Sequence, residues 1–107
     1  MDFKENVVIL TGASTGIGEA LAHELAGQGA WLVLAARNAQ KLETVAAECR
    51  ARGGRALVVA TDVTGEAECR ELIERTVAEY GRIDTLINNA GLSMWTKLED
   101  VEDLSTL

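Results

Sequence analysis

A glycine-rich stretch between an apolar run and an amphipathic segment constrains this chain more than any other feature. Residues 6–11 are mostly apolar, and glycines then stand at positions 12, 16 and 18. After them, apolar residues recur at helical spacing until Gly27 and Gly29, and Gly29 is well placed as a left-handed cap. The apolar stripe of this predicted helix is Ile17, Ala20, Leu21, Ala22 and Leu25. A continuous apolar run is typical of a strand buried on both faces. A helix that follows such a strand through a glycine loop presents unpaired N–H groups, which suit a phosphate. The sequence therefore predicts a phosphate-binding loop.

The rest of the chain repeats this alternation of strand and helix. Three more apolar runs predict strands at residues 30–36, 56–60 and 83–88. Asn38 and Thr64 stand where they could cap the two helices between these strands. Strands that alternate with helices form a parallel sheet through right-handed crossovers. We therefore expect one α/β domain over residues 1–107.

We expect this domain to be a Rossmann-type doubly wound parallel sheet, with the strand order 3-2-1-4 in the part present. In such sheets, ligands bind where the strand order reverses. Leu98 begins a fourth helix that the sequence does not finish, so the chain looks cut.

Charge and cysteine usage narrow the class of protein. The 107 residues include 17 acidic and 10 basic side chains, and 4% of the residues are aromatic. This balance argues against a nucleic-acid or anionic membrane partner. Cys49 and Cys69 are too far apart for a CxxC pair, and no signal peptide is visible, so a cytoplasmic location is expected. His23, the only histidine, lies opposite the apolar stripe of its helix, so we expect a solvated side chain and no metal site.

The glycine loop has a distinct task for each residue. Gly12 would make the tight turn, Gly16 would allow close approach of a diphosphate, and Gly18 would allow close packing of helix on strand. The hydroxyl groups of Ser14 and Thr15 could bond phosphate or ribose oxygens. The loop residues expected to contact a nucleotide are Gly12, Ser14, Thr15, Gly16, Ile17 and Gly18.

This spacing, TGxxxGxG, resembles the cofactor loop of the short-chain dehydrogenase/reductase family. The resemblance extends over essentially the whole chain. Asp62-Val63 is similar to the family's Asp-Val pair, in which a carboxylate accepts from the adenine amino group and the next N–H donates to a ring nitrogen. Asp is also common where a turn begins, which is the alternative for Asp62.

A second family motif ends the fourth strand. Asn88-Asn89-Ala90-Gly91 resembles NNAG, which implies that Asn88 braces neighbouring strands while the backbone of Asn89 and Ala90 touches the cofactor. The strand order would place Asn89, Ala90 and Gly91 beside the glycine loop. Small residues there leave room for the adenosine ribose, although turn chemistry alone could also select them.

The end of the second strand indicates which nicotinamide nucleotide binds. NAD-specific folds place an acidic residue there, but no acidic residue occurs between Glu24 and Glu43. A guanidinium can bind the 2′-phosphate of NADP through a fork of charged hydrogen bonds. We therefore expect NADP rather than NAD, with Arg37 as the phosphate clamp and Asn38 as a second donor. Arg37 could instead be a solvated residue at a strand end. Many NADP-using relatives carry a further basic residue in the glycine loop, where this chain has Thr15.

The resemblance implies hydride transfer between NADPH and a carbonyl or alcohol substrate, and a homo-oligomer for the full-length protein. A tyrosine acts as acid/base in this family, with a lysine four residues later. Tyr80 is the only tyrosine, and Asp84 stands four residues after it. We therefore expect Tyr80 to be a core residue and assign no catalytic residue to this chain. The family's catalytic serine, tyrosine and lysine would lie beyond Leu107, and the chain alone would be inactive.

Two other functions are compatible with the same residues. A chain that truly ends at Leu107 could be an NADP-binding module without turnover, or a scaffold that recruits a partner through the open edge of the fourth strand. Ser93, Met94 and Trp95 follow the NNAG motif on a loop that borders the substrate cleft in relatives. Trp95 could line that pocket or pack under the unfinished helix.

Overall fold

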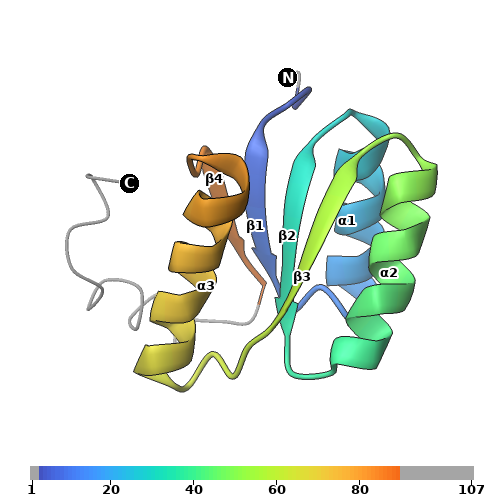
Figure 1. The fold of residues 1–107 in the computed structure, drawn as a ribbon. Coiled ribbons are helices and arrows are strands. Elements are labelled where there is room, and N and C mark those ends of the chain that lie inside the picture. The colour runs from blue at the N-terminus through green and yellow to red at the C-terminus, as the bar shows by residue number, and fades with distance from the viewer. Residues whose placement is uncertain (1–2, 90–107) are drawn as a thin grey trace.

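A computed structural model describes residues 3–89 of the chain as a parallel sheet covered by helices on both faces (Figure 1). The elements in chain order are β1 (Val7–Thr11), α1 (Gly16–Gly27), β2 (Trp31–Ala36), α2 (Ala39–Ala51), β3 (Arg55–Ala60), α3 (Glu66–Tyr80) and β4 (Thr85–Asn88). The predicted Leu98 helix and the loop of Ser93, Met94 and Trp95 lie outside these residues.

The four strands are hydrogen-bonded in the order β3-β2-β1-β4, which confirms the predicted topology. All pairings are parallel, and Thr11 at the end of β1 lies between Ala35 of β2 and Asn88 of β4. Because the carboxyl ends of the strands meet at one edge of the sheet, the loops that follow β1, β2 and β3 gather there, together with Asn89 after β4.

Two apolar cores lie on opposite faces of the sheet. Side chains alternate along a strand, so Val8 and Leu10 pack with α1 and α2 while Ile9 packs against α3. Every residue of β1 is buried. A central strand covered on both sides in this way explains why its sequence is continuously apolar.

Turn and cap residues set the ends of the helices largely as predicted. The Oδ1 of Asn38 accepts a hydrogen bond from the N–H of Lys41 at 3.0 Å and so caps α2. Gly29 and Gly81, which follow α1 and α3, have left-handed backbone angles of φ 83° and 81°. Thr64 is not the cap of α3. Gly65 occupies that position, and the Thr64 hydroxyl donates to Asp62 instead.

The buried stripe of α1 differs from the predicted one. Gly18, Ala22, Leu25 and Ala26 are buried, whereas Ile17 is 77% exposed and Ala20 is also exposed. Residues at i, i+4 and i+7 share one helix face, and Ile17 lies about 100° around the helix from Gly18. Ile17 therefore points away from the sheet.

His23 is not the solvated residue that the sequence predicts. Its side chain is 18% exposed, and its Nε2 lies 3.3 Å from Oε1 of Glu48 on α2. A ring nitrogen of His23 and one carboxylate oxygen each of Glu19 and Glu48, which are atoms of the kind that bind metals, lie within 4.8 Å of one another. The ammonium group of Lys41 also lies 3.4 Å from Oε2 of Glu19. These side chains therefore form a polar contact between α1 and α2.

An aromatic and basic cluster occupies the amino-terminal end of β2. The guanidinium carbon of Arg55 lies 4.3 Å, and that of Arg82 5.7 Å, from the centre of the Trp31 ring. The rings of Trp31 and Tyr80 are 5.7 Å apart, and the Tyr80 hydroxyl donates to the carbonyl oxygen of Leu32 at 3.2 Å. Tyr80 is thus a partly buried packing residue, as expected.

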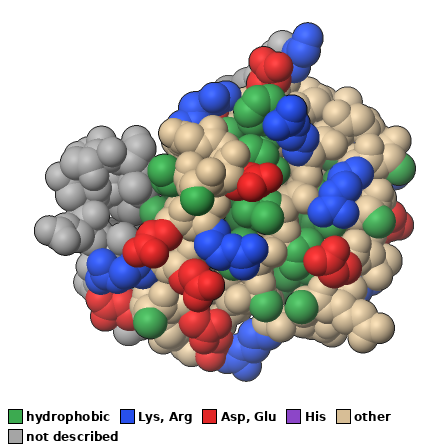
Figure 2. All heavy atoms as spheres, in the orientation of Figure 1, with side chains coloured by type: hydrophobic (Ala, Val, Ile, Leu, Met, Phe, Trp, Pro, Cys, Tyr) green, Lys and Arg blue, Asp and Glu red, His purple; other side chains and the backbone are tan. Residues whose placement is uncertain are grey.

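Acidic and basic side chains are interspersed over the face that α3 covers (Figure 2). Within residues 3–89, every helix is too short or too polar to cross a membrane.

Candidate nucleotide-binding site

A hollow of about 270 Å³ opens at the carboxyl ends of β1, β2 and β3. Its lining comes from the loops that follow these strands and consists of Gly12, Ser14, Thr15, Ala36, Arg37, Asn38, Thr61 and Val63. Six of these eight residues were expected to contact a nucleotide. Ala36 and Thr61 were missed, although their position at strand ends on this edge of the sheet was a usable signal.

The glycine loop is built around the carbonyl oxygen of Gly12. Gly12 has φ 65°, a left-handed conformation that favours glycine. Its oxygen accepts from the N–H of Thr15 at 3.3 Å and from the Thr15 hydroxyl at 3.1 Å. A β-carbon on Gly18 would overlap this same oxygen. The close packing predicted for Gly18 is therefore present, and it is directed at the loop.

Gly16 faces open space at the start of α1. Among the residues that the structure describes, and apart from its chain neighbours and its own helix backbone, no atom would lie within 4 Å of a β-carbon at this position. Thr15 occupies the N-cap position, yet its side chain makes no cap hydrogen bond because its hydroxyl bonds Gly12. Within the described residues, the first turn of α1 is thus left without a side-chain cap. Exposed N–H groups at a helix N-terminus attract anions.

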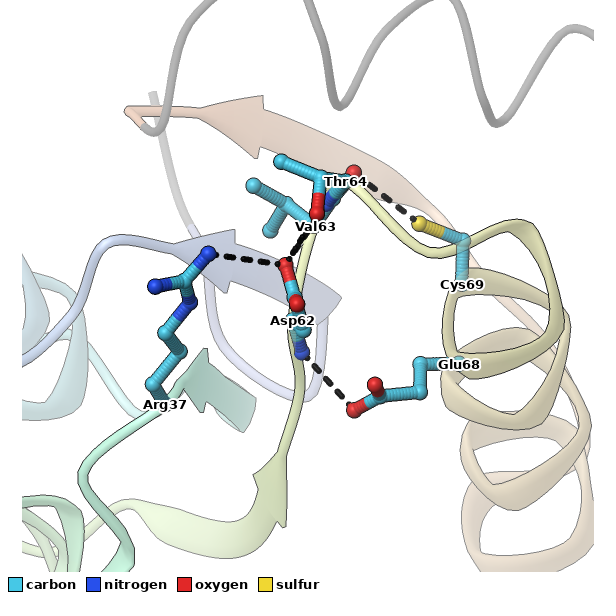
Figure 3. Close-up of polar contacts among 6 residues, drawn as sticks. All are labelled: Arg37, Asp62, Val63, Thr64, Glu68 and Cys69. Carbon is cyan, nitrogen blue, oxygen red and sulfur yellow. Dashed lines mark hydrogen bonds and ion pairs between the residues drawn. The ribbon is translucent and has the colours of Figure 1, made fainter.

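The side chain of Arg37 extends from the end of β2 to Asp62 after β3 (Figure 3). Its Nη2 lies 3.1 Å from Oδ1 of Asp62, and the two side chains are 73% and 37% exposed. An ion pair this exposed contributes little to stability. The pair nevertheless brings together two residues that the sequence assigned to different parts of a nucleotide.

Asp62 is held in place by its neighbours. Its Oδ1 accepts from the hydroxyl of Thr64 at 2.6 Å and from the Thr64 N–H at 3.0 Å, while the Asp62 N–H donates to Glu68 at 2.9 Å (Figure 3). The bonds from the Thr64 hydroxyl and N–H, and then Arg37, lower the pKa of Asp62 below its ordinary value. Asp62 is therefore ionised at neutral pH and is oriented at the rim of the hollow.

Val63 follows Asp62 and lines the hollow on the side of α3. Its carbonyl oxygen accepts from the thiol of Cys69 at 3.6 Å (Figure 3). Its side chain is partly buried against the core beneath α3. The sequence did not show that the segment after β3 is tied down through Cys69 and Glu68.

The end of β4 lies beside the glycine loop, as expected. The Thr11 hydroxyl donates to Oδ1 of Asn88 at 3.2 Å, which braces β1 against β4. The Nδ2 of Asn89 donates to the oxygen of Gly12 at 3.3 Å. Ala90 and Gly91 lie outside the described residues.

Comparisons with known proteins agree with this geometry. The sequence profile of the family described as short chain dehydrogenase matches residues 6–106. Among curated proteins, 11-beta-hydroxysteroid dehydrogenase A of Sesamum indicum is 46% identical over 105 residues, which cover 97% of this chain and 30% of that protein. The chain therefore belongs to the short-chain dehydrogenase family of oxidoreductases, whose members bind nicotinamide cofactors.

Two solved structures show the same fold with different cofactors. A metagenomic short-chain oxidoreductase in complex with NADP has a TM-score of 0.80 and 40% identity, with 85% of this chain and 41% of that one covered. NAD⁺-bound xylitol dehydrogenase has a TM-score of 0.77 and 34% identity, with 80% and 33% covered. Similarity to solved structures therefore indicates a nicotinamide dinucleotide but does not distinguish NADP from NAD. The chain spans about a third of the length of the curated relatives it matches.

Proposed function

We propose that this chain is the cofactor-binding portion of an NADP-dependent oxidoreductase that transfers a hydride between NADPH and a carbonyl or alcohol substrate. Family membership supports the reaction class. The observation that carries the choice of NADP is the position of Arg37 on the lining of the hollow, directly after β2. The nicotinamide ring would supply or accept the hydride when the cofactor is bound.

The loop residues fit a diphosphate. The open space at Gly16 would let the phosphate groups approach the backbone, and the uncapped first turn of α1 would donate N–H groups to them. The Thr15 hydroxyl, which bonds Gly12 in this structure, could rotate to donate to a phosphate oxygen. These groups bind the cofactor and orient it but do not take part in the transfer of the hydride.

The rim of the hollow fits an adenosine. Three donor groups converge on Oδ1 of Asp62, so the other carboxylate oxygen is the one that would accept from the adenine amino group. The N–H of Val63 would donate to the ring. Asn89 would lie along the adenosine ribose from the opposite side, because its amide already contacts Gly12.

Arg37 and Asn38 would hold the 2′-phosphate. The guanidinium group is mostly exposed and so free to turn toward a ligand. Asn38 uses its Oδ1 to cap α2, which leaves its amide nitrogen to donate to the phosphate. An acidic side chain at the end of β2 would repel that phosphate, and this chain has none there.

Replacing Arg37 with aspartate tests the proposal. Dissociation constants for NADP⁺ and NAD⁺ would be measured by isothermal titration calorimetry in the parent protein and in Arg37→Asp. A charge-assisted bond contributes about 1.5–3 kcal/mol, so we expect the NADP⁺ preference to fall by about 10- to 100-fold. Arg70→Asp is the matched control, because Arg70 is a partly exposed arginine on α3, away from the residues that line the hollow. A preference that is the same in all three proteins contradicts the proposal.

A further inference from the structure

We propose that Lys41 is a second cation of the 2′-phosphate site and that Glu19 pairs with its ammonium group, and so competes with the phosphate for it, until the cofactor binds. The inference rests on the proposed NADP dependence, which it deepens by adding a residue that determines specificity. It is carried by a second hollow, by an ion pair between two helices, and by the charge of a phosphate monoester.

The second hollow adjoins the first at Asn38. It measures about 270 Å³ and is lined by Asn38, Gln40, Lys41 and Thr44. Asn38 also lines the nucleotide hollow, next to Arg37. A group bound between Arg37 and Asn38 would therefore lie beside a space that Lys41 lines from the first turn of α2.

The ammonium group of Lys41 extends from α2 to the start of α1. Its Nζ lies 3.4 Å from Oε2 of Glu19, and the two side chains are 42% and 28% exposed. The N–H of Glu19 donates to the carbonyl oxygen of Thr15 at 2.7 Å, so Glu19 follows the glycine loop by one helical turn. The charge of Lys41 thus lies between the amino-terminal ends of α1 and α2, where the phosphate groups of a dinucleotide would bind.

The charge of the ligand calls for more than Arg37. A phosphate monoester carries about −1.5 to −2 charges at neutral pH. Arg37 supplies one positive charge and already faces the carboxylate of Asp62 at 3.1 Å. Arg37 and Lys41 are the basic residues that line the two hollows. Lys41 would supply the missing positive charge.

The hold of Glu19 on Lys41 is weak enough to be released. Ion pairs at the protein surface are worth about 0–1 kcal/mol. A phosphate monoester carries more negative charge than a carboxylate, so it attracts the ammonium group of Lys41 more strongly than Glu19 does. The side chain of Lys41 also does not take part in the cap of α2, which uses its backbone N–H. Lys41 can therefore move toward a phosphate without disturbing the helix.

The test compares 2′,5′-ADP, which carries the 2′-phosphate, with 5′-AMP, which lacks it. Binding of each would be measured by calorimetry to the parent protein and to Lys41→Gln, Lys41→Arg and Glu19→Gln. We expect Lys41→Gln to lower the affinity for 2′,5′-ADP by about 5- to 20-fold and to change the affinity for 5′-AMP by no more than about 2-fold. Lys41→Arg should retain most of the affinity for 2′,5′-ADP. Glu19→Gln should raise that affinity by about 2- to 5-fold, because the ammonium group of Lys41 then has no competing carboxylate.

Lys4→Gln is the control, since it removes the same charge next to Gly29, at the far end of the sheet. The inference is overturned if Lys41→Gln changes the affinity for neither ligand or changes both affinities equally. It is also overturned if Lys41→Gln lowers the affinity for 2′,5′-ADP no more than Lys4→Gln does. Failure of the proposed function has a different signature, because the parent protein would then bind both ligands equally and Arg37→Asp would not alter their ratio.

Discussion

Gly18 lies directly against the carbonyl oxygen of Gly12, and this contact locks the first turn of α1 onto the loop that follows β1. A β-carbon on Gly18 would overlap that oxygen and would also come within 2.8 Å of the Asn89 amide nitrogen. Gly16, two residues earlier, faces open space. The two glycines therefore serve different purposes, one in packing and one in leaving room.

Gly18→Ala should destabilise the protein. The added methyl group must displace backbone rather than a flexible side chain, and overpacking of this kind costs about 1–3 kcal/mol. Urea unfolding followed by circular dichroism measures the change in the free energy of unfolding. An unchanged midpoint would show that the loop yields to the methyl group easily.

Gly16→Ala should leave stability within about 0.5 kcal/mol, since exposed substitutions of this kind are nearly neutral. Gly16→Ala should nevertheless lower the affinity for NADPH by about 10-fold or more, because the added methyl group takes up the space through which the diphosphate approaches. Calorimetric titration with NADPH provides the measurement. Full affinity in a well-folded Gly16→Ala protein would mean that the diphosphate lies elsewhere.

Tyr80→Phe should affect stability and not cofactor binding. The lost hydroxyl donates to the oxygen of buried Leu32, so we expect a cost of about 0.5–1.5 kcal/mol. Leu32 lies five residues before Arg37, roughly 17 Å along an extended strand, which separates Tyr80 from the nucleotide hollow. Thermal unfolding and NADPH titration of the same variant test both halves. A loss of affinity at unchanged stability would contradict the packing role.

Asp84→Ala should destabilise the protein by about 1–3 kcal/mol, because the N–H of buried Val7 loses its carboxylate acceptor. That bond, at 2.8 Å, and the neighbouring Arg82 lower the pKa of Asp84. Because the pKa of Asp84 is lowered in the folded state, its ionised carboxylate stabilises the folded protein. This contribution to the free energy of unfolding is complete above the ordinary pKa of 3.8 and is lost as the pH falls through the pKa of the folded state. Urea unfolding between pH 2 and pH 7 measures it.

The parent protein should therefore lose more stability on acidification than Asp84→Ala does. Glu74→Ala, at an exposed position on α3, is the control and should follow the parent. Parallel pH curves for the parent and Asp84→Ala would show that the carboxylate does not act through its charge.

The thiol of Cys49 should resist labelling in the folded protein. Burial, and then the charge of Glu48, raises its pKa to about 11 from an ordinary value of 9.0. The thiolate fraction at pH 8 is then lower by about 100-fold, and access is blocked as well. Reaction of a Cys69→Ala protein with a disulfide reagent, with and without urea, isolates this thiol. Equal rates in the two conditions would exclude a buried Cys49.

The parts of the fold that the sequence predicted depend on local pattern. The continuous apolar runs identified the four strands, and the glycines after α1 and α3 adopt the left-handed conformation expected of helix ends. Asn38 caps α2 because a side-chain acceptor three residues before a helical N–H is a local arrangement. Such features need no knowledge of what lies across the sheet.

The features that the sequence did not reveal depend on contacts between distant segments. The pairing of His23 with Glu48, and that of Arg37 with Asp62, each join residues 25 positions apart. Ile17 fits an apolar helical stripe, and its exposure becomes visible only once the start of α1 is placed relative to the sheet. The sequence therefore proposed candidate site residues one by one, and it did not reveal the contacts between them.

The stacking of Trp31 with Arg55 and Arg82 has a practical consequence for spectroscopy. The indole lies at the end of β2 opposite the nucleotide hollow, between cationic groups that belong to β3 and to the segment after α3. Its emission should report whether these three segments remain assembled, and should respond little to an occupant of the distant hollow. A titration that relies on intrinsic fluorescence of Trp31 would thus underreport binding, whereas the emission of a reduced dinucleotide itself would register it.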